Sequence, residues 1–400
     1  MPTIMGARYR LSQLLKQTAD FTYRPPGGEI HDIGLAKLGP KAKRAFVKYS
    51  IYSIPYYIKG DPLQCPQINE HSMYWEAAEM VRQLNERGYV VDYHHVHSKA
   101  PIEWEKYDLL IDEGGSLIRM PEHLRAGRTR IFYASSNYWL FQNMAELRRI
   151  EDFHRRHGLF ISPERQAPPN YANEAADYMT YLGTDFQLRL FDRPAHKHQL
   201  NISAVYEPDY QRRNMAEART KFVWLGSGGL LLKGLDLVVE AFAQMPELTL
   251  YIGGHAEREA RFWSWLEPML AKHPNLKYMG WVDVGSRKFA DLAQQCLGTV
   301  YLSASEGGGG AVVQLAHFGL IPITTETSTV RDELATVIRS QEPSEIIAQT
   351  IKTVRELVAL PEAELHARSE AAHAFARRHH TRAAYAQSFA ALLDRVEAGR

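Results

Sequence analysis

The chain has 400 residues, more than one hydrophobic core usually holds, so we expect two domains. The 47 Lys and Arg residues against 46 Asp and Glu leave a formal charge of +1, which argues against a nucleic-acid-binding protein. A hydrophobic content of 45% with 23% charged residues excludes a mostly disordered chain. Cys65 and Cys296 lie far apart in the sequence, which excludes a disulfide framework and a Cys-built zinc site and favours the reducing cytoplasm.

The N-terminal segment, residues 1–17, carries Arg8, Arg10 and Lys16 beside apolar residues. It lacks the continuous apolar run and the cleavage site of a secretory signal. The pattern favours a surface helix that packs on its domain, and the alternative is a peripheral contact with anionic lipid at the inner membrane face. No run of about 18 apolar residues occurs, so we expect no membrane-spanning helix.

Short apolar runs alternate with helical patterns through the first half of the chain, which predicts a parallel sheet flanked by helices. The Pro- and Asn-rich stretch 162–175 is predicted as a loop. The expected strands are 45–53, 89–96, 107–115, 130–136, 176–183 and 200–205, and the expected helices are 70–88 and 137–158.

A polar connection, 206–219, separates this half from a second alternation of the same kind. The last residues, 363–400, have helical spacing. The expected strands are 220–227, 247–254, 276–282, 298–305 and 320–325, and the expected helices are 235–245, 258–273, 286–296 and 311–319. The predicted fold class is therefore α/β, with two Rossmann-like domains that face a central cleft, where such folds bind ligands.

The predicted division has four parts. Residues 1–42 form an N-terminal extension and 43–208 the first Rossmann-like domain, for the acceptor. Residues 209–375 form the second Rossmann-like domain, for the nucleotide-sugar donor. Residues 376–400 form a helix that packs back on the first domain.

The segment 301–323 carries the clearest signal for a ligand site. A strand ends at an acid, Glu306, and four glycines, 307–310, lead into a helix that begins near Ala311. Unobstructed backbone N–H groups and the helix N-terminus suit a diphosphate, while Glu306 suits ligand hydroxyls. Gln314 is the one polar side chain in residues 311–316, so we expect it to face the ligand. The alternative is a tight strand-to-helix turn with a structural glycine run and a Gln bonded within the protein.

A second glycine-rich turn follows the strand 220–227. Gly226, Ser227, Gly228 and Gly229 allow a close approach of the backbone, and Lys233 offers a positive charge to a phosphate. The turn matches neither the P-loop nor the dinucleotide-binding pattern. An ordinary solvated lysine is the alternative.

Taken together, the two turns resemble the donor-binding domain of retaining GT-B glycosyltransferases of family 4. The resemblance covers about residues 220–330, and the first half of the chain matches only in its rhythm of strands and helices. The matching positions are Gly226, Lys233–Gly234, Gly280–Trp281–Val282, Glu306 through Gln314, Gly319 and Pro322.

The resemblance implies roles for these residues. Glu306 would hold the donor sugar, and Lys233 would stabilise the departing diphosphate together with backbone N–H groups. It implies no metal ion and no cofactor beyond the nucleotide-sugar donor. Two departures from the pattern are Ser227, where the family has an arginine, and Gln314, where it has a glutamate. The expected donor-binding residues are Gly226, Ser227, Gly228, Gly254, Trp281, Val282, Gly308, Gly309, Gly310, Ala311 and Gln314.

Polar residues that follow strands of the first half, with one at a helix start, are the candidates for acceptor binding. They are His71, Asp112, Glu113, Gly114 and Asn137. For His71 the alternative is a helix cap. The predicted function is transfer of a sugar from a nucleoside diphosphate sugar to a hydroxyl of a glycan or glycolipid, with retention. The alternative is a catalytically silent GT-B protein that binds a nucleotide or a glycan within a biosynthetic complex.

Overall fold

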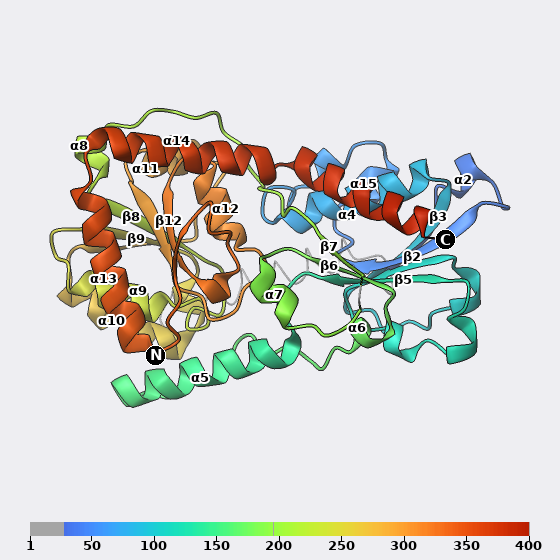
Figure 1. Cartoon of the computed structure of the whole chain (residues 1–400), viewed down its shortest axis with the longest axis horizontal. Helices are drawn as coiled ribbons and strands as arrows, with labels where there is room; N and C mark the ends of the chain where they lie inside the picture. The colour runs from blue at the N-terminus through green and yellow to red at the C-terminus, as the bar shows by residue number, and fades with distance from the viewer. Residues whose placement is uncertain (1–27, 195, 400) are drawn as a thin grey trace, which may run out of the picture. The chain divides into compact units, whose positions relative to one another are not determined.

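The computed structural model describes residues 28–194 and 196–399. These residues form two compact units, one of residues 28–132 with 175–177 and one of residues 133–174 with 178–399 (Figure 1). Both units combine parallel strands with helices, so the predicted α/β class is confirmed. The expected N-terminal surface helix, residues 1–17, lies outside the described residues.

The first sheet has seven strands in the order β1-β3-β2-β4-β5-β6-β7. Strand β1 pairs antiparallel with β3, and the neighbours β3-β2, β2-β4, β4-β5 and β6-β7 are parallel. The elements that open this part of the chain are β1 (Glu29–Ile33), α2 (Leu35–Leu38), β2 (Lys43–Tyr49), α3 (Ile54–Ile58), α4 (Ser72–Glu86), β3 (Tyr89–His95), β4 (Leu109–Asp112) and β5 (Thr129–Ala134).

Helix α4 shows why the apolar pattern of this region folds as it does. Its buried positions include Ala77, Met80, Val81 and Leu84, which recur at the spacing of one helical face. Gly88 follows the helix with a φ of 83°, a conformation that favours glycine at a helix end. Every residue of β3 is buried, as expected of a strand that is covered on both faces.

The second unit continues with α5 (Trp139–His157), α6 (Ala172–Ala175), β6 (Tyr178–Tyr181), α7 (Asp185–Arg189), β7 (His196–Gln199) and α8 (Met215–Ala218). Its own sheet is built from β8 (Lys221–Leu225), α9 (Leu235–Ala243), β9 (Thr249–Gly253), α10 (Ala260–Lys272), β10 (Leu276–Gly280), α11 (Arg287–Gln294), β11 (Gly298–Tyr301), α12 (Gly310–Ala316), β12 (Ile321–Thr325) and β13 (Thr336–Ile338). Three helices end the chain: α13 (Pro343–Ala359), α14 (Glu362–His379) and α15 (Arg382–Ala398).

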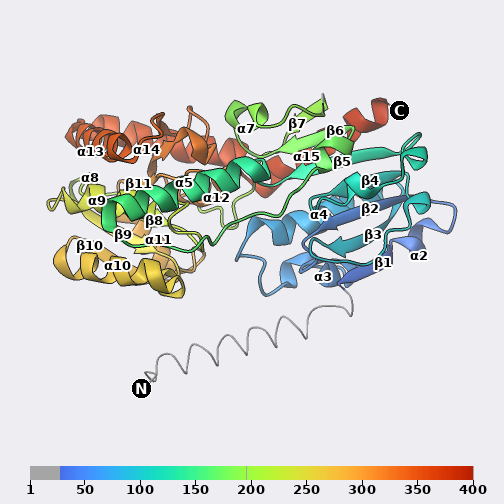
Figure 2. The ribbon, with the colours of Figure 1, turned by 90° about the horizontal axis from the view of Figure 1, so that it is seen from below.

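The sheet of the second unit is parallel throughout, in the order β10-β9-β8-β11-β12-β13. Alternate residues of β8 face opposite layers. Phe222 and Trp224 pack with α9, α10 and α13, while Val223 packs with α11 and α12. Figure 2 shows β10 and α10 at one edge of this unit and α13 and α14 at the opposite edge. The carboxyl ends of all six strands therefore meet at one edge of the sheet.

Helix α5 explains where the chain divides. Its Ile150 and Phe153 belong to the same hydrophobic core as Phe222 and Trp224, so residues 133–174 join the second unit. The compact units thus divide the chain at a different place from the predicted boundary at residues 208–209. At the other end of the chain, α15 contacts residues 133 and 198: the Tyr133 and Tyr385 hydroxyls are 3.3 Å apart, and the His198 ring bonds to the Ser388 carbonyl.

Two expectations about local structure were wrong. Residues 29–38 are not part of an extension but form β1 and α2, because β1 pairs with the edge of β3. The strand expected at 200–205 is instead β7, at 196–199. The backbone of residues 202–204 instead forms hydrogen bonds with His380, which lies between α14 and α15. The His380 ring donates to the Ile202 carbonyl, and the Ala204 N–H donates to the His380 carbonyl.

His380 is enclosed by these contacts. Its side chain is buried, and burial lowers its pKa to about 3, so the ring is neutral at pH 7. His317 of α12 donates from Nε2 to the His380 carbonyl, and burial lowers its pKa to about 4. These two neutral histidines connect α12 to the start of α15.

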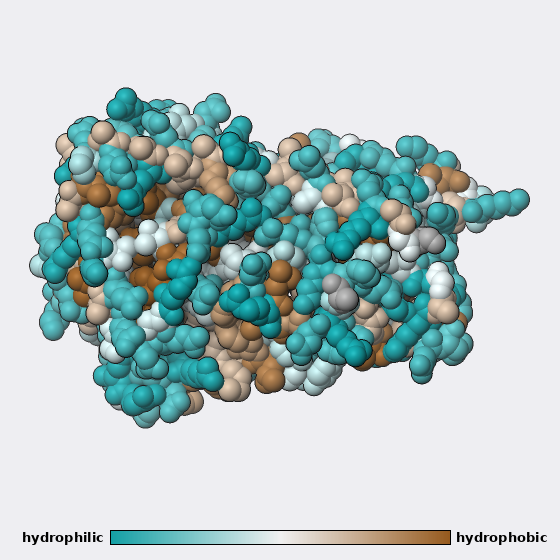
Figure 3. Space-filling model, in the orientation of Figure 1, coloured by the Kyte–Doolittle hydropathy of each residue, from teal (hydrophilic) through white to brown (hydrophobic). Residues whose placement is uncertain are grey.

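The face in Figure 3 is mostly hydrophilic, with hydrophobic side chains in several places, one of them over the N-terminal half of α5. Leu140, Met144 and Leu147 are 47%, 44% and 49% exposed there. In the described residues no helix has both the length and the apolar character to cross a membrane. No group of three His, Cys, Asp or Glu side chains in the same residues has the arrangement of a metal site.

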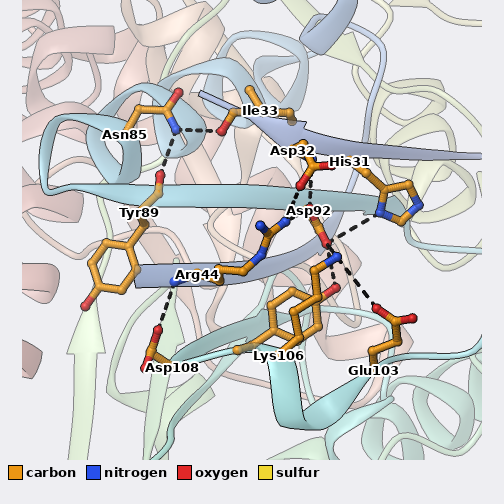
Figure 4. Close-up of polar contacts among 11 residues, drawn as sticks. His31, Asp32, Ile33, Arg44, Asn85, Tyr89, Asp92, Glu103, Lys106 and Asp108 are labelled. Atoms are coloured by element: carbon orange, nitrogen blue, oxygen red, sulfur yellow. Dashed lines mark hydrogen bonds and ion pairs between the residues drawn. The ribbon is translucent and has the colours of Figure 1, made fainter. Parts of the chain in front are cut away.

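One buried carboxylate organises the edge of the first sheet. Asp92 of β3 is fully buried, and its oxygens accept from Lys106 at 2.7 Å and from Arg44 and the Tyr107 hydroxyl at 2.9 Å each (Figure 4). Burial alone would raise the pKa of Asp92. Hydrogen bonds from the Asp32 N–H, Lys106 and Tyr107, with the charge of Arg44, outweigh burial and hold this pKa well below its usual range.

We predict that Asp92→Asn lowers the free energy of unfolding by about 1.5–3 kcal/mol at pH 7, the range for hydrogen bonds to charged groups. A lowered folded-state pKa stabilises the fold above the usual pKa of aspartate, and this stabilisation is lost as the pH falls below about 4. Urea unfolding at pH 7 and pH 3 measures both effects. Asp32→Asn is the control, since Asp32 is half exposed. An equal loss at both pH values would contradict the prediction.

Candidate functional site

The candidate site lies at the carboxyl edge of the second sheet, where the turns after β8 and β9 are in backbone contact. The Gly226 N–H, after β8, donates to the Gly253 carbonyl at the end of β9. A Cβ atom at Gly254 would lie 2.2 Å from the Gly226 oxygen. Glycine is needed at Gly254 because no side chain fits between the two turns.

The turn that carries Lys233 lies against the end of β11 in the same way. Gly234 has a φ of 70°, and a Cβ atom there would lie 2.1 Å from the Leu302 oxygen. The Ala304 N–H donates to the Leu232 carbonyl at 2.8 Å. This contact joins the two glycine-rich segments that were predicted to bind the ligand.

Lys233 and Glu306 meet at this junction. The Lys233 Nζ lies 3.9 Å from the Glu306 Oε1 and donates to the Ser227 hydroxyl at 3.4 Å. Lys233 is only 7% exposed, and burial lowers its pKa although the Glu306 charge opposes this effect. The structure therefore places a buried ammonium and a carboxylate side by side, as two residues with complementary ligand chemistry.

The Glu306 side chain interacts with Tyr301. The Tyr301 hydroxyl is hydrogen-bonded to the Glu306 side chain, and burial, followed by the Glu306 charge, raises the pKa of Tyr301 well above its usual value. The Glu306 backbone is held as well, since its N–H donates to the Thr327 carbonyl and its carbonyl accepts from the Thr329 hydroxyl. The carboxylate keeps 22% of its side chain exposed to solvent. It can therefore accept hydrogen bonds from a ligand without moving.

The glycine run after Glu306 serves packing at three of its four positions. A Cβ atom at Gly307 would lie 2.2 Å from the Ser135 oxygen, at Gly308 2.9 Å from the Leu182 oxygen, and at Gly309 2.3 Å from a methyl group of Val330. These contacts match the structural alternative given above for the run. Helix α12 starts at Gly310, and the N–H groups of Gly310 and Ala311 have no partner within the helix. Those groups are the donors that this turn can offer to an anion.

The backbone N–H groups of the first glycine turn already donate to a carboxylate of the protein. Glu259 accepts from the Gly229 N–H at 2.6 Å and from the Leu230 N–H at 3.2 Å. Burial raises the pKa of Glu259, and these two hydrogen bonds act in the opposite direction. A phosphate at this turn would therefore meet Lys233 and the Ser227 hydroxyl rather than the N–H of Gly229. Gly228 has open space around it, since a Cβ atom there would meet only the Glu259 carboxylate, at 3.8 Å.

Gln314 has a different set of contacts from those expected of a ribose-binding residue. Its side-chain oxygen accepts from the N–H groups of Val205 and Tyr206 at 3.1 Å each, and its amide donates to the Tyr206 carbonyl at 2.8 Å. The side chain is buried, with 4% exposure of the residue. The expectation that Gln314 faces the ligand is therefore wrong for this structure, because the backbone of residues 205–206 satisfies the amide.

A flat aromatic surface lies beside the turns, after β9 and β10. The rings of His255 and Trp281 stack at 4.7 Å between centroids with 7° between their planes. Trp281 is 52% exposed, while Val282 packs against Gly253. Trp281 was predicted from the sequence as a donor-binding residue, whereas His255 was not. The signal that could have found it is its position directly after Gly254, where the turns approach each other.

The acceptor candidates of the first unit have local structural partners. Asp112 is fully buried and accepts from the N–H groups of Gly114 at 2.8 Å and Leu117 at 2.9 Å, so its carboxylate caps the turn after β4. The expectation that Asp112 lines a ligand site is wrong for this reason. His71 accepts from the Met73 N–H and caps α4, which is the alternative given above. The Glu113 N–H donates to the Lys48 carbonyl.

Asn137 lies in the second unit, beside the strand end that carries Glu306. Its amide donates to the Ser305 hydroxyl at 3.1 Å, and the residue is only 3% exposed. Among the described residues nothing forms a hydrogen bond with its side-chain oxygen. The structure thus groups Asn137 with Glu306 and Lys233, whereas the other four acceptor candidates belong to the first unit.

Comparisons with known proteins bear on the fold. The chain is similar to sucrose-phosphate synthase from Thermosynechococcus elongatus, at 12% identity and a TM-score of 0.56 over 90% of this chain and 100% of that one. Anabaena HepE in complex with UDP and glucose matches at 11% identity and a TM-score of 0.52, over 88% and 100%. The chain has a GT-B fold. WaaG, a glycosyltransferase involved in lipopolysaccharide biosynthesis, matches at 14% identity and a TM-score of 0.51, over 87% and 98%.

Three other matched structures are longer, and the chain spans between 54% and 57% of their length. No protein-family model and no curated protein sequence matches the chain. The predicted GT-B fold is confirmed by the solved structures, whereas membership of family 4 stays a prediction.

We predict that Gln314→Ala lowers the free energy of unfolding by about 1–3 kcal/mol, the cost of leaving buried backbone groups without a partner. The variant should keep the affinity of the wild type for a nucleoside diphosphate. Urea unfolding and calorimetric titration measure the two quantities. A variant of unchanged stability that binds nucleotide more weakly would restore Gln314 as a ligand contact.

Proposed function

We propose that this chain transfers a sugar from a nucleoside diphosphate sugar to a hydroxyl of a glycan or glycolipid acceptor, with retention. The observation that carries the proposal is the pair formed by Lys233 and Glu306 at the carboxyl edge of the second sheet of a GT-B fold. An ammonium suits the diphosphate, and a carboxylate suits the hydroxyls of the sugar. Retention and the acceptor class come from the family 4 resemblance.

In this proposal Lys233 acts on the leaving group. Negative charge grows on the diphosphate as its bond to the sugar breaks, and a positive charge that is already in place stabilises that change without reorganisation. The N–H groups of Gly310 and Ala311 add to the effect. Because Lys233 supplies the positive charge, the proposed reaction needs no metal ion.

Glu306 would orient the donor sugar. Its carboxylate is held by Tyr301 and remains exposed on one side, so it can accept hydrogen bonds from two sugar hydroxyls. The Asn137 amide group, bonded to Ser305, lies beside this residue and would contribute a further polar contact. The stacked rings of His255 and Trp281 would hold the nucleobase.

A second candidate function is a GT-B protein that binds its ligand without turnover. Two observations favour it: Gln314 is occupied by the backbone, and Glu259 takes N–H groups of the first glycine turn. Incubation with a panel of radiolabelled nucleotide sugars separates the candidates. Release of sugar or its transfer supports the enzyme, while binding with neither hydrolysis nor transfer on any acceptor supports the silent protein.

The simplest first experiment is a thermal-shift panel of UDP, GDP, ADP and TDP. We predict that UDP raises the melting temperature most, an expectation supported by the UDP complexes of HepE, which has the same fold. A ligand at about 100 times its dissociation constant adds about 2.7 kcal/mol to the stability of the folded state. No shift with any of the four nucleotides would contradict the proposed function.

Lys233 and Glu306 should fail differently when each is replaced. We predict that Lys233→Ala weakens nucleoside diphosphate binding and slows turnover together, at a cost of about 1.5–3 kcal/mol for a charged hydrogen-bond partner. Glu306→Ala should leave that binding nearly intact while turnover falls, because Glu306 meets only the sugar. Calorimetry with UDP beside initial rates with the sugar nucleotide gives both quantities.

The matched control for these variants is Glu326→Ala, an acid on the next loop whose partner is the exposed Arg189. It should change neither quantity. If Glu306→Ala abolishes diphosphate binding in a folded protein, Glu306 is not a sugar contact and the proposed arrangement of the site is wrong.

The aromatic surface gives a separate prediction. Trp281→Ala should weaken UDP binding by about 0.5–1.5 kcal/mol, the range for aromatic pairs, and leave the binding of inorganic pyrophosphate unchanged. Tyr171→Ala, which removes another exposed ring of the same unit, is the control. Equal losses for UDP and pyrophosphate would show that Trp281 acts on the turns rather than on the base.

A further inference from the structure

The segment after α5 brings an arginine to the glycine turn that carries Lys233. The backbone of this segment is fixed on α5 by polar side chains of the helix. Glu146, only 3% exposed, accepts from the N–H groups of Glu164 and Arg165 at 2.8 Å each. Gln142 donates to the Arg165 carbonyl at 2.7 Å. The backbone of Arg165 is therefore held on both of its polar groups.

A further anchor lies two residues along. Asn143 of α5 accepts from the Ala167 N–H at 2.7 Å and donates to the Ala167 carbonyl at 2.9 Å. Pro-rich loops often adopt several backbone conformations. Here three side chains of α5, from Gln142, Asn143 and Glu146, fix the backbone of residues 164–167. Such anchoring sets where the intervening side chain can reach.

The side chain of Arg165 lies across Gly229. A Cβ atom at Gly229 would be 2.2 Å from the Arg165 Cγ and 2.9 Å from its Cδ, and Gly229 also has a φ of 77°. The glycine thus accommodates the aliphatic stem of the arginine. The stem packs on the turn, which leaves the guanidinium at its far end.

The charge of this guanidinium is felt at the centre of the site. Burial is the main cause of the lowered pKa of Lys233, and the Arg165 charge adds to it, whereas at Tyr301 the same charge opposes the rise in pKa that burial causes. Coulombic effects weaken with distance, so the Arg165 charge lies near the residues that hold Glu306. Within the part of the chain that the structure describes, Arg165 has no ion pair and no side-chain hydrogen bond.

Two carboxylates at the glycine turns, Glu306 and Glu259, are already engaged. Glu306 is bonded to Tyr301 and lies beside Lys233, and Glu259 accepts from the backbone of the glycine turn. A guanidinium presents five N–H donors in a planar fork that matches phosphate oxygens. The donors of Arg165 therefore have no acceptor among the described residues, and they lie next to the turn where the proposed function puts a diphosphate.

We propose that Arg165 is a second cation for the diphosphate of the donor, supplied by the segment after α5 rather than by the glycine turn itself. The inference rests on the proposed function. Lys233 approaches the anion from the turn before α9 as a point charge, and Arg165 approaches from the neighbouring segment with a planar fork. Two cations from different segments would clamp the diphosphate and set its orientation.

The test compares Arg165→Met and Arg165→Lys in the full chain, with inorganic pyrophosphate and UDP as the probes. Met keeps the length of the stem over Gly229 and removes the charge, whereas Lys keeps the charge and removes the fork. Calorimetric dissociation constants are measured beside the melting temperature without ligand. Arg155→Met is the matched control, since Arg155 is an exposed residue of α5 with only a surface partner, Glu151.

We expect Arg165→Met to weaken the binding of both probes by about tenfold or more, as for the loss of a charged hydrogen bond. Arg165→Lys should show a smaller loss, with the melting temperature of the wild type. Arg155→Met should bind both probes as the wild type does. The equal loss for UDP and pyrophosphate assigns the contact to the diphosphate.

Two results would overturn the inference in distinguishable ways. If the wild type binds UDP and pyrophosphate and both Arg165 variants bind them equally well, Arg165 only packs on Gly229, and the proposed function stands. If the wild type binds neither probe, the proposed function fails and the inference fails with it. A fall in the melting temperature of Arg165→Met alone leaves Arg165→Lys to decide between these outcomes.

Discussion

The contact that the candidate site depends on is the approach of backbone turns at the carboxyl edge of the second sheet. Gly254 meets the Gly226 oxygen and Gly234 meets the Leu302 oxygen at distances that admit no side chain. A larger residue at either position would push the turns apart, because backbone atoms cannot yield as a flexible side chain does. Lys233 would then no longer reach Glu306. The arrangement of Lys233 and Glu306 thus depends on glycine, which has no Cβ atom, at both positions.

Burial of Lys233 is the second consequence of this packing. Removing an ammonium from water is unfavourable, and the lowered pKa of Lys233 reflects that cost. The fold offsets it with Glu306 at 3.9 Å, a distance too long for a strong hydrogen bond. Both groups therefore keep hydrogen-bonding capacity for a ligand. Because this cost is met on folding, a diphosphate would find the positive charge already desolvated and oriented.

Local sequence signals predicted most of the strands and both glycine-rich turns, since each depends on residues close together in the chain. They also selected Lys233 and Glu306 one by one, although the contact between the two joins segments distant in the sequence. These signals gave wrong predictions for polar side chains that can form hydrogen bonds either with a ligand or with the backbone. Gln314 and Asp112 both bond to backbone groups, which are always present, whereas a ligand contact needs an open path to solvent. His255 and Arg165 were missed for the opposite reason. Their contacts, with Trp281 and with Gly229, join segments distant in the sequence, so the only local signal was the position of His255 directly after Gly254.

The departure at Ser227 illustrates the same limit. The resemblance leads to an arginine directly after Gly226, and the chain has a hydroxyl there instead. Gly229, three residues on, has the space and the backbone conformation to receive the stem of Arg165 from another segment. The glycine-rich turn is thus explained by what packs on it as much as by what it binds. The atoms around each glycine of these turns therefore decide its role. Where a Cβ atom would meet another part of the chain, as at Gly229, the glycine makes room for the protein itself, and where the space is open, as at Gly228, it leaves room for a ligand.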